Sequence, residues 1–276
     1  MKIFKRNLMR LTRTPLPPQV KDDPIHVRIR DVHKSYGDHH VLKGVSLDIH
    51  RQKTNLIIGP SGSGKTVLMR QLIRLESPDS GELLVNGLDF AKLEGLNLAS
   101  MRRTFGMVFQ MSALFDSMTV FDNVAFPLRE HTDLSKKEVR DRVMDRLAVL
   151  GVAAAAYKLP AQLSGGMQKR VAVARAMILE SEILIYDEPT TGLDPITTEM
   201  VDDLIVEAQE MFGVTSVVIS HDMASVVRIA DYLSLTIATP LLMVLAVTVN
   251  SGLIGLFENT PVLGWIMQNL NTITPL

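Results

Sequence analysis

The spacing of hydrophobic and polar residues changes several times along this chain, and each change predicts a different element. From residue 26 to residue 57, short apolar stretches alternate with polar residues around Gly37 and Gly44, a pattern typical of antiparallel strands. Residues 56–58 are uniformly apolar, which indicates a buried strand. From residue 66 to residue 75 the apolar positions fall at helical spacing, so we expect a helix directly after that strand.

The second half of the chain alternates strand and helix patterns. An apolar stretch that ends at Gln110 predicts one strand. Ser135 and Glu138 stand at capping-box spacing, so we expect a helix to begin there and to end at Gly151. Further strands are expected at 183–187 and 214–220, and further helices at 166–180 and 196–212. This alternation predicts an α/β fold with a mostly parallel sheet that is covered on both faces.

Composition removes several classes of function. A length of 276 residues is enough for one or two domains with a sizeable core. The 29 lysines and arginines nearly balance the 30 acidic residues, so overall charge gives no reason to expect a nucleic-acid partner. The chain has no cysteine, which excludes disulfides, thiolate metal sites and cysteine nucleophiles. Its chemistry must therefore use carboxylates, lysines, histidines and backbone amides.

The two ends of the chain differ in composition from its middle. Residues 1–24 are rich in basic residues and proline and lack an apolar run of signal-peptide length. We expect either a solvated disordered arm or a segment that touches anionic lipid. From residue 232 to residue 276 the only charged residue is Glu258. The sequence thus divides into an arm at 1–24, a folded domain at 25–231 and an apolar tail at 232–276.

A glycine-rich loop carries the strongest chemical signal. It matches the pattern G-x-x-x-x-G-K-[ST], in which backbone N–H groups wrap an anionic phosphate between a strand and a helix. Lys65 would reach the β- and γ-phosphates, and the Thr66 hydroxyl would hold Mg²⁺. The residues expected to bind ATP in this loop are Gly59, Pro60, Ser61, Gly62, Ser63, Gly64, Lys65 and Thr66.

Two carboxylates follow a buried strand. Asp187 ends the apolar stretch and would lie at the carboxyl edge of the sheet, where ligands bind in open α/β folds. We expect its carboxylate to hold Mg²⁺, directly or through water. Glu188 comes next and can polarise a water molecule that attacks the γ-phosphate. With Lys65 as a further catalytic group, these residues predict an ATPase whose cofactors are ATP and Mg²⁺.

Three more residues suit such a site, although their spacing alone leaves their roles open. Gln110 ends a strand and could contact Mg²⁺ or the water, or it could be structural. His221 follows another apolar strand. Tyr36 precedes Gly37 and could stack on adenine or pack within an edge strand.

A second motif identifies a family. Residues 163–168 read Leu-Ser-Gly-Gly-Met-Gln, and together with the phosphate loop, Gln110, residues 183–188 and His221 they make residues 26–231 resemble the nucleotide-binding subunits of ABC transporters. The resemblance implies a P-loop NTPase fold of ABC type. Such a fold has a mostly parallel RecA-like core sheet, an antiparallel β edge and a helical subdomain, here at about residues 111–170.

The resemblance also implies a dimer. In that family the signature lies at the start of a helix and binds the γ-phosphate held by the phosphate loop of a second copy. Two copies would therefore meet head to tail and share two ATP sites, with His221 contacting the γ-phosphate and Gln110 the metal or the water. The residues expected to bind ATP across the interface are Ser164, Gly165, Gly166, Gln168 and Asp194.

A closer resemblance lies between these motifs. Residues 115–132, together with Asp194 and the two residues after it, look like the ATPases of Mla-type phospholipid transporters. This implies partners in an integral membrane permease and an MCE-domain protein, and a place at the cytoplasmic face of the inner membrane. The alternative is an ABC-type ATPase that drives an envelope or cell-division partner without translocation. A DNA-repair or translation ATPase is disfavoured because the chain lacks a long coiled-coil insertion and a second cassette.

The tail departs from the family pattern. After Asp231 the family continues with two strands around a charged turn, whereas here the sequence is almost uniformly apolar. Either the strand pair survives with an apolar turn, or the ATPase is joined to a membrane segment, such as a fragment of a permease. The absence of charge over residues 232–257 favours a membrane-seeking tail that anchors the protein, since about 20 apolar residues span a bilayer.

Overall fold

The computed structural model describes residues 19–59, 61–109, 112–235 and 247–248. Its antiparallel sheet consists of β1 (Ile25–Tyr36), β2 (His39–His50), β4 (Ser80–Val85) and β5 (Leu88–Asp89), in the order β2-β1-β4-β5. Val27 on β1 pairs with Ile49 on one side and with Val85 on the other. The expected antiparallel strands are therefore present, and β4 adds a strand that had no counterpart among them.

The second sheet is mostly parallel, as predicted. It consists of β3 (Thr54–Ile58), β6 (Phe105–Phe109), β7 (Ile183–Asp187), β8 (Thr215–Ser220), β9 (Tyr232–Leu235) and β10 (Val247–Thr248), in the order β10-β9-β3-β8-β7-β6. Ile58 lies opposite Ser220, and Asp187 lies opposite both Ile219 and Phe109. Because these strand ends are aligned, the segments that follow β3, β7 and β8 leave from the same edge of the sheet.

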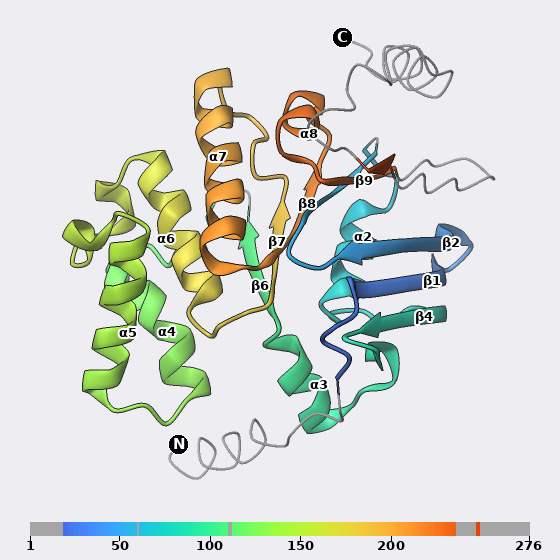
Figure 1. Cartoon of the computed structure of the whole chain (residues 1–276), viewed down its shortest axis with the longest axis horizontal. Helices are drawn as coiled ribbons and strands as arrows, with labels where there is room; N and C mark the ends of the chain where they lie inside the picture. The colour runs from blue at the N-terminus through green and yellow to red at the C-terminus, as the bar shows by residue number, and fades with distance from the viewer. Residues whose placement is uncertain (1–18, 60, 110–111, 236–246, 249–276) are drawn as a thin grey trace.

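Helices occupy both sides of this sheet (Figure 1). They are α2 (Lys65–Leu72), α3 (Gly95–Arg102), α4 (Val120–His131), α5 (Lys136–Val149), α6 (Gly165–Met177), α7 (Pro195–Phe212) and α8 (Met223–Ile229), with short 3₁₀ helices at Phe90–Lys92, Ala153–Ala155 and Pro160–Gln162. The capping box predicted before α5 is confirmed, since Ser135 and Glu138 bond reciprocally. In Figure 1, α4, α5 and α6 form a helical group on the side of the molecule away from β1, β2 and β4.

Alternate residues of the central strands face two different hydrophobic cores. On β7, Ile183 and Ile185 pack with α2 and the antiparallel sheet, whereas Leu184 and Tyr186 pack with α4, α5, α6 and α7. On β3, Ile57 joins the first core, while Leu56 and Ile58 join the second. All of these side chains are at most 2% exposed. A sheet buried on both faces is what the uniformly apolar strands predict.

The six described residues of the expected membrane segment at 232–257 are strands rather than part of a membrane helix. Its first residues, Tyr232–Leu235, are strand β9, which pairs in parallel with β3 and places the 7% exposed Leu233 in the core. Val247–Thr248 pairs antiparallel with β9, so a strand pair follows Asp231. Strand β9 therefore lies between β3 and β10, and the sheet extends past the expected boundary at residue 231. Residues 236–246 and 249–276 lie outside the described residues.

Among the residues that the structure describes, no helix combines the length and apolar character needed to cross a membrane.

Candidate active site

The glycine-rich loop joins β3 to α2 at the carboxyl edge of the sheet. Gly62 and Gly64 have φ angles of 80° and 90°, in the left-handed region that favours glycine. A Cβ atom on Gly64 would lie 2.8 Å from Leu42 and 3.1 Å from Val41, so a side chain there would also collide with β2. The left-handed φ angle and the close approach of β2 therefore both require glycine at position 64, directly before α2. Pro60, also expected to bind ATP, lies outside the described residues.

Other loop residues differ in exposure. Ser61, Gly62 and Thr66 are exposed at the loop and the start of α2. Ser63 is 3% exposed, and its hydroxyl has no hydrogen-bond partner among the described residues. Thr66, the residue that the sequence assigns to the metal, is therefore accessible at the start of α2, whereas Ser63 is not.

Lys65 is held inside the loop. Its side chain is 8% exposed, and Nζ donates a hydrogen bond to the Gly59 carbonyl oxygen at 2.6 Å. Burial lowers the pKa of Lys65, while the negative charges of Glu188 and Asp187 act in the opposite direction. The ammonium group therefore lies within electrostatic range of both carboxylates, at the end of the loop that the sequence assigns to phosphate.

Asp187 continues one face of β7. Its position follows Ile183 and Ile185 at strand spacing, and those two residues pack against the core that includes α2. Burial raises the pKa of Asp187, and the neighbouring Glu188 raises it further, while Lys65 opposes the shift. The carboxylate is thus placed in a negative, partly desolvated environment that a cation would relieve.

The oxygen ligands that Asp187 and Thr66 offer fit an Mg²⁺ ion that is bound together with a nucleotide. Mg²⁺ is usually held by one or two carboxylates plus substrate phosphates rather than by an all-protein cage. The described part of the chain contains no cluster of three or more His, Cys, Asp or Glu residues that could hold a metal. Asp187 and Thr66 supply oxygen ligands of the right type. Gln110, the third expected ligand, lies outside the described residues.

Glu188 is fixed by both backbone and side-chain contacts. Its φ angle is 47°, in the left-handed region, and its N–H donates to the Ile219 carbonyl oxygen of β8 at 2.9 Å. The Thr191 hydroxyl donates to Glu188 Oε2 at 2.8 Å, and His221 Nδ1 lies 2.8 Å from the same oxygen. His221 is 57% exposed and Glu188 22%. The structure therefore brings Glu188 and His221, which follow different strands, together at the sheet edge.

Tyr36 lies at the end of β1 and is 46% exposed. Its hydroxyl donates a short hydrogen bond to Glu76, which is also the main cause of a raised Tyr36 pKa. The Lys34 ammonium lies 5.7 Å from the centre of the Tyr36 ring. The ring is not packed in a core, and stacking on adenine stays a prediction.

The signature residues begin a 13-residue helix, α6. Ser164 is its N-cap and accepts a hydrogen bond from the Met167 N–H at 3.4 Å. Ser164 and Gly165 are exposed, and a Cβ atom on Gly165 would meet nothing within 4 Å. Gln168 turns inward, and its Nε2 donates to the Pro160 carbonyl oxygen at 3.1 Å. Free N–H groups at a helix start suit an anion.

Asp194 caps the next helix. Its Oδ1 accepts hydrogen bonds from the N–H groups of Ile196 and Thr197, both at 3.1 Å. The Thr197 hydroxyl also donates to Oδ2 at 2.5 Å and is the main reason that the Asp194 pKa is lowered. Asp194 thus begins α7 within its own chain, and its role toward a second copy stays a prediction.

Two basic residues on α6 were missed in the sequence. Lys169 is buried, and its Nζ donates to the carbonyl oxygen of Pro189, directly after Glu188, at 3.2 Å. Arg175 donates to the carbonyl oxygens of Ala113 and Ser112 at 2.8 and 3.0 Å. The helical pattern of α6 places them on a helix but does not show what they contact. Together they tie the signature helix to two segments at the sheet edge.

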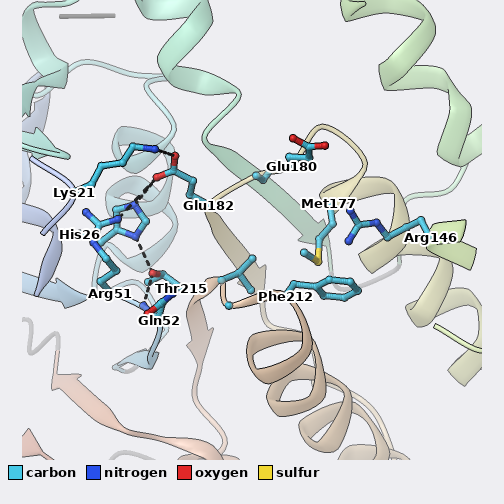
Figure 2. Close-up of a pocket in the computed structure, with 13 residues that line it drawn as sticks. Lys21, His26, Arg51, Gln52, Arg146, Met177, Glu180, Glu182, Phe212 and Thr215 are labelled. Carbon is cyan, nitrogen blue, oxygen red and sulfur yellow. Dashed lines mark hydrogen bonds and ion pairs between the residues drawn. The ribbon is translucent and has the colours of Figure 1, made fainter. Parts of the chain in front are cut away.

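A cavity of about 430 Å³ lies at the opposite end of β7 and β8 (Figure 2). There Glu182 accepts from Lys21 Nζ at 2.9 Å and lies 3.3 Å from His26 Nε2, contacts that hold the pKa of Glu182 well below its usual range. His26 is 2% exposed, and its Nδ1 lies 2.7 Å from the Thr215 hydroxyl. These polar groups are paired with one another, and none belongs to the expected ATP site.

Comparisons with known proteins agree with the fold and the motifs. Residues 42–191 match the family model described as ABC transporter. The chain is 43% identical over 206 residues to the intermembrane phospholipid transport system ATP-binding protein MlaF of Escherichia coli K12, covering 75% of this chain and 77% of MlaF. It is 38% identical over 198 residues to the probable ribonucleotide transport ATP-binding protein mkl of Mycobacterium leprae, covering 72% of this chain but 57% of that relative's length.

Solved structures are similar over most of the chain. The cbiO1 structure from Clostridium perfringens, described as part of the ABC transporter complex cbiONQ, has a TM-score of 0.76 at 27% identity and covers 91% of this chain and 98% of that one. A dimeric post-hydrolysis structure of the ATP-binding cassette MJ0796, bound to ADP and Pi, has a TM-score of 0.68 at 30% identity and covers 82% of this chain and 99% of that one.

Proposed function

Since this chain belongs to the ABC transporter family and is an ATP-binding subunit of the ATPase type, we propose that it powers phospholipid transport in the bacterial envelope. The observation that carries the ATPase mechanism is the Glu188 carboxylate, held by Thr191 and His221 close to Lys65. The lipid assignment rests on the 43% identity to MlaF over three quarters of the chain.

In the proposed reaction, backbone N–H groups of residues 59–66 bind the phosphates, and Lys65 neutralises charge on the β- and γ-phosphates. Thr66, Gln110 and Asp187 would hold Mg²⁺, which neutralises further charge when bound. Glu188 orients water for attack on the γ-phosphorus. The new bond joins the water oxygen to phosphorus, the bond from phosphorus to the ADP oxygen breaks, and Glu188 accepts the proton from water.

A second copy would complete each site. The exposed Ser164 hydroxyl, the glycine N–H groups beside it and the capped start of α6 form a surface that suits the γ-phosphate of a partner's ATP. The residues that we assign to this contact are Ser164, Gly165, Gly166, Gln168 and Asp194. The dimeric MJ0796 cassettes support a dimer of this type.

Further partners follow from the relation to MlaF. We propose an integral permease and an MCE-domain protein, with the ATPase at the cytoplasmic face of the inner membrane. Aromatic residues are available for such contact in the helical group: Phe115 is 44% exposed and Phe126 36%, and their rings meet edge to face at 5.3 Å. Tyr157 is 70% exposed, and the centre of its ring lies 6.2 Å from that of Phe121 on α4.

The test is a reconstituted complex. The chain is placed with the proposed permease and MCE-domain protein in vesicles that contain a fluorescent phospholipid, and ATP-dependent transfer is measured. Glu188→Gln should bind ATP normally but lower hydrolysis by about 10²- to 10⁴-fold and stop transfer, because water is no longer polarised. Lys65→Ala should instead weaken ATP binding.

Each result separates the two parts of the proposal. Near-normal turnover of Glu188→Gln would remove Glu188 from the reaction. ATP hydrolysis without lipid transfer, together with copurification of a cell-division factor in place of a permease, would support the alternative of an ATPase that acts without translocation.

A further inference from the structure

We infer that Thr191 is a positioning residue for hydrolysis, because its hydroxyl fixes the carboxylate of Glu188 in the orientation that activates water. The inference rests on the proposed role of Glu188 and extends it to a residue outside the motif. Thr191 Oγ1 donates to Glu188 Oε2 at 2.8 Å. The backbone N–H of Thr191 also points to the Glu188 carbonyl oxygen at 3.3 Å, so the two residues close one turn.

The hydrogen bonds to the Glu188 carboxylate show which of its two oxygens is free to contact water. An ionised carboxylate only accepts hydrogen bonds, so the Thr191 hydroxyl must donate, and His221 Nδ1 at 2.8 Å must carry a proton in this contact. Both donors address Oε2. Within the described residues Oε1 receives no hydrogen bond, so it is the oxygen that can accept a proton from water.

The two donors, Thr191 and His221, differ in how closely the chain ties them to Glu188. His221 is 57% exposed and follows β8, a different strand. In the proposed reaction it also turns to the γ-phosphate. Thr191 lies three residues after Glu188 in the same turn, so it keeps its contact while His221 serves the phosphate. The Glu188 backbone is itself anchored to Ile219 at 2.9 Å, which leaves the side-chain torsions as the freedom that Thr191 removes.

The neighbouring threonine provides a matched control. Thr190 is 4% exposed, and its hydroxyl has no hydrogen-bond partner among the described residues. Thr190→Val and Thr191→Val are the same chemical change one position apart, because valine keeps the shape and removes the hydroxyl. Only the second change removes a contact to Glu188. Thr191→Ser keeps that hydroxyl.

The experiment measures ATPase kinetics of the full chain in its partner complex. Thr191→Val should lower kcat by about tenfold to a hundredfold, the range for a lost hydrogen bond to a charged group, with KM for ATP changed less than about twofold. Thr191→Ser should recover most of the lost kcat. Thr190→Val should keep the wild-type kcat. Thermal unfolding of each variant confirms that it is folded.

Several results would overturn the inference. These are an unchanged kcat in Thr191→Val, an equal loss in the valine and serine variants, or an equal loss in Thr190→Val. In a Glu188→Gln background, Thr191→Val should add little further loss, since residues that act as a unit are not additive. If Glu188→Gln itself keeps turnover, both the role of Glu188 and this inference fail. If Glu188→Gln is inactive but Thr191→Val is normal, this inference alone fails.

Discussion

A single buried carboxyl group on α7 makes the stability of the folded protein depend on pH. Asp202 is 1% exposed, its Oδ1 has no hydrogen-bond partner among the described residues, and burial raises its pKa from 3.8 to about 6. Ser225 and Arg228 on α8 partly oppose the shift, while Asp222 and Asp203 add to it. The folded protein therefore binds this proton more tightly than the unfolded chain does.

The sign of the effect follows from linkage. The stabilising contribution of Asp202 is complete below about pH 4 and is lost as the pH rises through about 6. Asp202→Asn cannot ionise, so we expect it to be more stable than the wild type at pH 7.5 by up to ~3 kcal/mol, from a shift of about two units at 1.36 kcal/mol each. Urea unfolding at pH 7.5 and pH 5 measures this difference, which should shrink at pH 5. A difference that is equal at both pH values would contradict it.

Sequence reasoning found the site residues that belong to motifs and missed those that depend on tertiary contacts. Lys65, Asp187 and Glu188 could be predicted because the loop pattern and the buried strand place them at one edge of the sheet. Thr191 and Arg175 carry no pattern of their own. Their roles come from a turn geometry and from a loop contact that appear only when distant segments are folded together.

At the scale of elements, α6 ties the helical group, of which it is part, to the sheet edge. Arg175 donates to two carbonyl oxygens of residues 112 and 113, whose φ angles of 60° and 45° are both left-handed. Burial lowers the pKa of Arg175, and its guanidinium also lies 5.8 Å from the Phe115 ring. The planar guanidinium is the group whose geometry allows both bonds at once.

We therefore expect Arg175→Ala to destabilise the protein by about 2–3 kcal/mol, because two carbonyl oxygens lose their donors. Arg175→Lys should recover only part of this loss. Arg142→Ala is the control, since Arg142 forms an exposed pair with Glu180 at 3.5 Å, and such pairs contribute about 0–1 kcal/mol. Denaturant unfolding measures all three. Equal losses for the two alanine variants would show that Arg175 does not anchor the loop.

Elements whose hydrophobic residues recur with a clear period in the sequence were easier to predict than elements that depend on tertiary packing. Helix α5 has its capping box in the sequence, and its bounds were predicted closely. Helix α4 contains Pro127 in its interior, which opposes a helix by local propensity. It forms because Val124 and Leu128 are at most 1% exposed in the core shared with α6. Strand β9 was obscured by the apolar run that follows it.

At the scale of the whole molecule, the proposed shared sites predict complementation between defective subunits. Ser164→Arg removes the signature, and Lys65→Ala removes the phosphate contact. In a mixed dimer, one site takes its loop from the first chain and its signature from the second, so it is intact. We expect ATPase activity in the mixture to exceed that of either parent several-fold. The measurement uses two affinity tags to isolate heterodimers, and inactive isolated heterodimers would contradict shared sites.

The two-sided core of β7 has a consequence for how the chain can vary. Odd-numbered positions from Ile183 to Asp187 face α2, and the even-numbered Leu184 and Tyr186 face the helical group. Inserting or deleting one residue within this strand would exchange odd for even, bury the carboxylate of Asp187 among the helices and turn Tyr186 toward the phosphate loop. The site thus depends on which face of the sheet each residue of β7 occupies. Insertions and deletions can therefore accumulate only in the connections between strands.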